Sequence, residues 1–141
     1  NDYQALLGRR ASRPRLTDPP YNVVIDGNVC GKGSISHREF AMASGEMSSE
    51  AFTTFLSQTL SLTASRSRDG AFGFVCMDWR HMREMLDAGA SAFAEFKDLC
   101  VWNKTNGGMG TFYRSKHELI FVFKIGTAPP TSSFGLGDSG R

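Results

Sequence analysis

Apolar positions recur at helical spacing over residues 49–65, on one side of the segment. Ser48 precedes the stretch as a preferred N-cap residue, and Glu50 falls in the first turn, where the helix dipole favours a negative charge. The pattern therefore predicts a helix over residues 49–65. The apolar positions that define it are Phe52, Phe55, Leu56 and Leu60.

Four other segments carry strand patterns. Residues 71–77 form a continuous apolar run that ends at Asp78, which is typical of a strand buried on both faces. Residues 14–17, 96–102 and 119–123 are the other strand candidates. Trp102 and the phenylalanines of the last strand are expected in the core.

Residues 79–86 are expected to form a second helix, ended by Gly89. Strand, helix, strand, helix, strand is the order of an α/β fold with parallel pairing and right-handed crossovers. The strand at 119–123 follows a loop instead of a helix, so we expect it to run antiparallel at the edge of the sheet. Residues 2–7 look like the end of a helix, and residues 24–45, with several glycines, look like a polar loop.

Composition indicates one globular domain. The 141 residues are 40% apolar and 21% charged, with a net charge of +2, so a DNA-binding surface would have to be a local patch. Cys30, Cys76 and Cys100 show no C-x-x-C spacing, and the three histidines share no metal-ligand spacing, which argues against a disulfide framework or a metal site. Reduced thiols favour a cytoplasmic location, and no apolar run is long enough for a membrane span.

The strongest chemical signal is the turn Asp18-Pro19-Pro20-Tyr21. Two prolines fix the backbone, so the Asp18 carboxylate and the Pro19 carbonyl are held as a rigid pair of acceptors for one planar amino group. Tyr21 offers a ring face for stacking. The alternative is a strand-ending turn in which Asp18 bonds local N–H groups and Tyr21 packs as a core residue.

This tetrapeptide resembles the catalytic motif of S-adenosylmethionine-dependent amino-methyltransferases. A second segment, in which Trp102, Lys104 and Asn106 are followed by His117, Glu118 and an apolar strand, looks like the later part of a site-specific DNA adenine-N6 methyltransferase. The resemblance implies a partial Rossmann-like methyltransferase sheet with flanking helices, S-adenosylmethionine as cofactor, double-stranded DNA as partner, and no metal.

The same resemblance assigns roles residue by residue. The catalytic residues are Asp18, Pro19 and Tyr21, and Asp18 also lies at the edge of the cofactor site. The substrate-binding residues are Pro20, Asn22, Lys104, Asn106, Arg114 and Lys116. Asp78 either assists at the site or caps the following helix, and the cap is favoured. The glycine-rich stretch 106–110, with the Tyr113, Arg114 and Lys116 that follow, either contacts phosphates or fills the gap left by an extruded base; alternatively, Gly107 and Gly108 only allow a tight connection.

A family member also needs a strand followed by a Phe-x-Gly-x-Gly turn, and this sequence has none; Gly135-Leu136-Gly137 follows prolines and serines instead. Residues 1–126 are therefore expected to be the catalytic half of a permuted methyltransferase, and residues 127–141 a linker toward the cofactor half. An uncovered strand edge would favour a homo-oligomer. Two other functions stay open: methylation of another amine, on cytosine N4, RNA or protein, and a nucleic-acid-binding remnant without activity.

Overall fold

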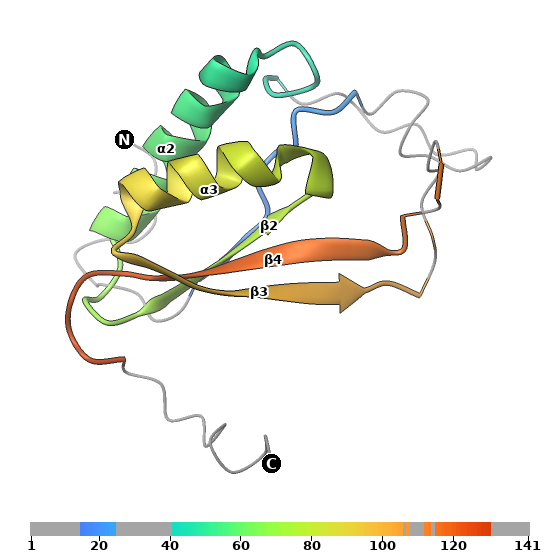
Figure 1. Cartoon of the computed structure of the whole chain (residues 1–141). Helices are drawn as coiled ribbons and strands as arrows, with labels where there is room; N and C mark the ends of the chain where they lie inside the picture. Colours follow the sequence, from blue (N-terminus) through green and yellow to red (C-terminus); the bar gives the residue numbers. More distant parts are fainter. Residues whose placement is uncertain (1–14, 25–40, 106, 108–111, 114, 131–141) are drawn as a thin grey trace.

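The computed structural model describes residues 15–24, 41–105, 107, 112–113 and 115–130. Within these residues a four-stranded mixed sheet carries two α-helices on one of its faces (Figure 1). The strands are β1 (Arg15–Thr17), β2 (Phe72–Met77), β3 (Glu95–Asn103) and β4 (His117–Lys124). The helices are α2 (Ser49–Ser65) and α3 (Met82–Ala92), the latter preceded by the 3₁₀ turn η1 (Trp79–His81). The prediction of a mixed α/β domain is confirmed at this level.

The strands lie in the order β1-β2-β4-β3. β1 pairs parallel with β2, as predicted, and β4 is antiparallel to both β2 and β3. The antiparallel direction of β4 is confirmed, but its predicted place at the edge is wrong, because β3 occupies the edge. The chain turns back after β3 so that β4 can pair along it, and β4 then fills the space beside β2.

Helix α2 has the bounds that the sequence predicts. Ser48 is its N-cap, and the Ser48 hydroxyl oxygen accepts a hydrogen bond from the Ala51 N–H at 3.2 Å. The capped end fixes where the helix begins, and its apolar side turns toward the sheet. Phe52, Leu56 and Leu60 are completely buried there.

Helix α3 differs from the expectation, because it extends to Ala92 and contains Gly89 within it. A Cβ at Gly89 would lie 2.3 Å from Cε1 of the Phe123 ring, so the missing side chain allows the helix to approach β4 closely. The helix ends instead at Phe93, whose N–H donates to the Gly89 carbonyl at 2.9 Å. The glycine is therefore a packing residue and not a stop.

The two faces of the sheet are unequally covered (Figure 1). Toward the helices, β2 and β4 bury Val75, Met77, Leu119, Phe121 and Phe123. Phe72 and Phe74 of β2 lie on the opposite face, over which no helix packs among the described residues, and they are only half-buried. The prediction that β2 is buried on both faces is therefore confirmed only in part. Trp102, expected in the core, is 55% exposed because β3 lies at the edge.

The chain turns at Asp69 and Gly70, with Gly70 at a φ of 80°. One Asp69 carboxylate oxygen accepts the Ala128 N–H at 2.8 Å, so the first residues of the expected linker are anchored to this turn. The helix end predicted at residues 2–7, most of the predicted polar loop (residues 25–40) and the greater part of the predicted linker (residues 131–141) lie outside the described residues.

We predict that Gly89→Ala lowers the free energy of unfolding by about 1–3 kcal/mol, because the added methyl group overlaps the Phe123 ring in a packed core. Urea denaturation followed by circular dichroism measures the loss. Gly73→Ala is the matched control: its Cβ would meet the Phe93 ring at 3.6 Å, an ordinary contact, so stability should change much less. Equal losses in the two variants would show that close helix packing is not the role of Gly89.

Candidate functional site

The described residues that the sequence singled out lie at the end of the sheet where β1, β2 and β3 have their carboxyl ends. β1 and β2 run parallel, so their carboxyl ends, followed by Asp18 and Asp78, lie at the same edge. β3 also ends there, because Asn103 pairs with His117 at the start of β4. In open α/β sheets ligands bind beyond the carboxyl ends of the strands, which makes this edge the candidate site.

The motif turn leaves β1 with its residues in different surroundings. Asp18 is exposed, Pro19 is buried, and Pro20 and Tyr21 are half-buried. The Tyr21 hydroxyl donates a hydrogen bond of 2.5 Å to Oδ1 of Asp18. Asp18 therefore bonds the side chain of its own motif, and its second carboxylate oxygen is the one left for an N–H donor of a ligand.

Electrostatics keep the Tyr21 phenol protonated. Burial, then the hydrogen bond to Asp18, and then the charges of Asp18, Glu118 and Cys76, raise the pKa of Tyr21 far above its ordinary value. Burial, followed by the charges of Asp18 and Glu118, also raises the pKa of the Cys76 thiol. The carboxylates of Asp18 and Glu118 thus both disfavour a further negative charge on Tyr21 or Cys76.

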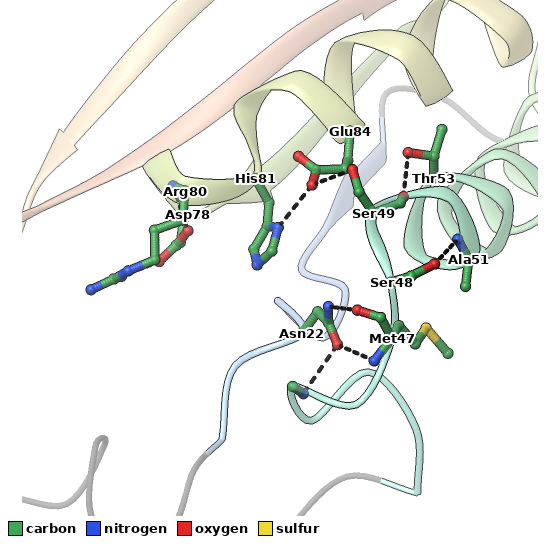
Figure 2. Close-up of polar contacts among 11 residues, drawn as sticks. Asn22, Met47, Ser48, Ser49, Ala51, Thr53, Asp78, Arg80, His81 and Glu84 are labelled. Carbon is green, nitrogen blue, oxygen red and sulfur yellow. Dashed lines mark hydrogen bonds and ion pairs between the residues drawn. The ribbon is translucent and has the colours of Figure 1, made fainter.

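Asn22 anchors the motif turn to a distant segment (Figure 2). Its side-chain Oδ1 accepts the N–H groups of Gly45 at 3.0 Å and of Met47 at 3.2 Å, while its Nδ2 donates to the Met47 carbonyl at 2.9 Å. Asn22 has a φ of 53°, in the left-handed region that asparagine tolerates better than most residues. The residue assigned to substrate binding thus bonds the backbone just before α2, which gives it a structural role.

A second polar cluster joins the first turns of the two helices (Figure 2). The Ser49 hydroxyl donates to Oε1 of Glu84 at 2.9 Å, and His81 Nδ1 lies 3.4 Å from the same oxygen. The His81 ring also packs edge-on against Phe52, with ring centroids 5.0 Å apart. Sequence reasoning missed this cluster. The i, i+3 spacing of His81 and Glu84 was a usable signal, whereas nothing in the sequence indicated Ser49.

Asp78 is a capping residue, as favoured from the sequence. Its Oδ1 accepts the Arg80 N–H at 2.7 Å, and its Oδ2 pairs with the Arg80 guanidinium at 2.6 Å. The carboxylate therefore opens η1 and fixes the chain direction after β2. Assistance in chemistry is not needed to explain this residue.

Of the remaining predicted residues, Lys104 and Lys116 lie on the β3–β4 side of the edge. Lys104 Nζ pairs with Glu118 Oε2 at 3.1 Å, and the Lys104 N–H donates to the Lys116 carbonyl at 2.7 Å, so both lysines flank the ends of these strands. Phe112 and Tyr113 are more than 80% exposed and pack edge-on against each other. Asn106 and Arg114 lie outside the described residues.

Among the described residues no group of three or more His, Cys, Asp or Glu side chains is arranged to hold a metal ion. In the same part of the chain, Cys76 and Cys100 are free thiols. No helix among these residues is both long and apolar enough to cross a bilayer.

No protein-family model matches this chain, and a search of curated proteins finds no match either.

We predict that Asn22→Ala destabilises the protein by about 1–3 kcal/mol. The substitution removes the side-chain hydrogen bonds to residues 45 and 47, and it places an alanine at a left-handed φ that asparagine tolerates better. Asn22→Gly removes the same bonds but tolerates the backbone conformation, so it should be the milder variant. Thermal denaturation of both separates the two contributions. Wild-type stability of Asn22→Ala would contradict the anchoring role.

A third prediction concerns acid stability. Partial burial raises the pKa of Glu84, but bonds from its own backbone N–H, from Ser49 and from His81 outweigh it, so the pKa is lowered from its ordinary value of 4.5. A lowered pKa contributes stability that is present above 4.5 and lost as the pH falls through the folded-state value.

Glu84→Gln should therefore cost stability at neutral pH, and its difference from wild type should shrink as the pH falls below 4.5. Denaturation measured from pH 7 to about pH 3 tests this. Ser49→Ala removes one of the bonds and should reduce the pH dependence in part. A difference between wild type and Glu84→Gln that does not change with pH would contradict the assignment.

Proposed function

We propose that this chain is the catalytic part of a DNA methyltransferase that acts on the N6 amine of a flipped-out adenine, with S-adenosylmethionine as methyl donor. One observation carries the proposal: Asp18 and Tyr21 lie together at the carboxyl end of a parallel strand pair, with an exposed carboxylate beside a half-buried ring. That arrangement suits a planar ligand with an amino group at its rim.

The fold is compatible with this function. A mixed sheet with helices, a parallel pair that carries the motif and one antiparallel strand fits part of a Rossmann-like methyltransferase sheet. The fold alone does not carry the argument, because one architecture hosts many activities. The motif at the strand end supports the proposal more directly.

The chemistry follows from the amine. The lone pair of adenine N6 is delocalised into the ring, so attack is favoured when acceptors hold both N–H groups and free that pair. Asp18 would accept one N–H through the carboxylate oxygen that Tyr21 does not use, and the Pro19 carbonyl would accept the other. The negative charge of the Asp18 carboxylate would complement the positive charge that develops on nitrogen.

The base must leave the duplex before its amine can react, since that amine is buried in pairing. The Tyr21 ring is held by its hydroxyl bond to Asp18 and would stack on the base, a contact worth about 1–3 kcal/mol. Lys104 and Lys116 would contact the DNA backbone near this edge, and Asn106 and Arg114, which lie outside the described residues, are proposed from the sequence for the same task. Pro20 would stiffen the turn beneath the base.

S-adenosylmethionine supplies an electrophilic methyl group when bound. The sequence contains no Phe-x-Gly-x-Gly turn to hold it, and Asp18 would lie only at the margin of such a site. The roles assigned here are therefore those of the amine-holding residues alone.

We predict that Asp18→Ala in the full-length enzyme lowers methyl transfer by at least about a hundredfold, since it removes the principal acceptor of the amine. Tritium transfer to a DNA duplex measures activity, and fluorescence anisotropy should show duplex binding largely unchanged. Wild-type turnover in this variant would refute the mechanism. Calorimetric titration with S-adenosylmethionine tests the binding-only alternative, for which no donor binding is expected.

Tyr21 variants separate stacking from hydrogen bonding. Tyr21→Ala should be milder than Asp18→Ala, with a loss of about 5- to 150-fold, equivalent to one stacking contact. Tyr21→Phe loses the hydrogen bond to Asp18 but keeps the ring. Because the ring is proposed to stack on the base, this variant should retain much of the activity. A phenylalanine variant as inactive as the alanine variant would show that orientation of Asp18 by the hydroxyl, and not stacking, is the main role of Tyr21.

A further inference from the structure

β3 is the outer strand on the side of the sheet away from β1 (Figure 1). Its side chains are exposed almost throughout, with Val101 61% and Trp102 55% accessible. Within the part of the chain that the structure describes, no strand pairs with its outer edge, and a free edge with exposed apolar side chains is a template for another strand. No proline interrupts it.

The pairing with β4 fixes which backbone groups of β3 point outward. The Lys104 N–H donates to the Lys116 carbonyl, so even-numbered residues at this end turn their backbone groups toward β4. Alternation in an antiparallel ladder then directs the backbone groups of Leu99, Val101 and Asn103 to the free edge. In agreement, the Leu99 N–H bonds the Asp98 carboxylate at 2.7 Å and not β4.

We propose that a second copy of this chain pairs with β3 in antiparallel orientation, with the two-fold axis at Val101. In that register Val101 faces its own equivalent and Leu99 faces Asn103 of the second copy. Every outward N–H and carbonyl between Leu99 and Asn103 then has a partner. The regular strand is long enough for this, because the register shift lies earlier, between Phe96 and Asp98.

Side-chain charges favour this register. Residues directly opposite share a face, so Asp98 of one copy lies opposite Lys104 of the other, and Cys100 lies opposite Trp102. Lys104 would then sit between two carboxylates, those of Glu118 and of the second Asp98. Asp98 would exchange its bond to the Leu99 N–H for this pair, while that N–H would pass to the Asn103 carbonyl.

A two-fold axis one residue earlier, at Cys100, is less favourable. It would set Asp98 opposite Trp102 and leave Lys104 opposite Phe96, at the register shift. The axis at Val101 is therefore the one that satisfies both the backbone and the charges. A single strand edge buries little area, so association should be weak and concentration-dependent.

Sedimentation velocity between about 1 µM and 500 µM tests the proposal, covering the range of weak interfaces. Wild type should shift from monomer to dimer. Val101→Pro removes an outward N–H that β4 does not use, so it should abolish the dimer and retain the monomer fold in circular dichroism. Val101→Thr keeps the N–H and should dimerise. A wild type that stays monomeric throughout, or a proline variant that still dimerises, would overturn the proposal.

Cross-linking tests the register independently. Trp102→Cys places a thiol opposite Cys100 of the second copy, within the usual span of a disulfide. Mild oxidation should yield a covalent dimer, and fragmentation of its linked tryptic peptides, residues 98–104 of each copy, should place the disulfide between positions 100 and 102. The same substitution in a Cys100→Ser background should give none. A cross-link that persists without Cys100, or its absence when Cys100 is present, would show that the strands do not pair in this register.

Discussion

Burial of the helix-facing side of β4 is the interaction on which the rest of the structure depends. Phe121 and Phe123 are essentially inaccessible, and they pack beneath both helices. β4 also pairs with β2 on one side and β3 on the other, so it holds together strands that never touch each other. Gly89 completes the contact, because only a residue without a side chain lets α3 lie against the Phe123 ring.

The site inherits its geometry from this arrangement. β1 has only three residues, too few to hold the motif turn firmly by pairing alone. The turn is secured by Asn22, whose bonds to residues 45 and 47 connect it to the start of α2. The Ser49–Glu84 bond then joins α2 to α3. The prolines stiffen the turn locally, and this chain of polar contacts positions it relative to the core.

Uneven coverage of the sheet separates two surfaces of different character. The carboxyl edge near Asp18 is polar and carries the proposed chemistry, whereas β3 exposes the apolar side chains of Val101 and Trp102. Antiparallel pairing through β3 would direct the carboxyl edges of two copies in opposite directions, so neither would cover the other's Asp18. Lys104 would be held by carboxylates in that assembly, and contact with DNA at this end would fall mainly to Lys116.

The sequence by itself determined the features that depend on near neighbours along the chain. Helical spacing and a capping serine placed α2 at its observed bounds, the apolar run placed β2, and the Asp78 cap was correctly favoured, because each signal acts within a few residues. The proximity of Asp18 and Asp78 followed from parallel pairing.

Only the tertiary structure decided the rest. The place of β4 inside the sheet, the exposure of Trp102 and the packing role of Gly89 depend on which strands become neighbours. The Asn22 bond spans 25 residues and the Ser49–Glu84 bond spans 35. Such contacts leave no local period in the sequence, because they exist only after the hydrophobic core has brought distant segments together.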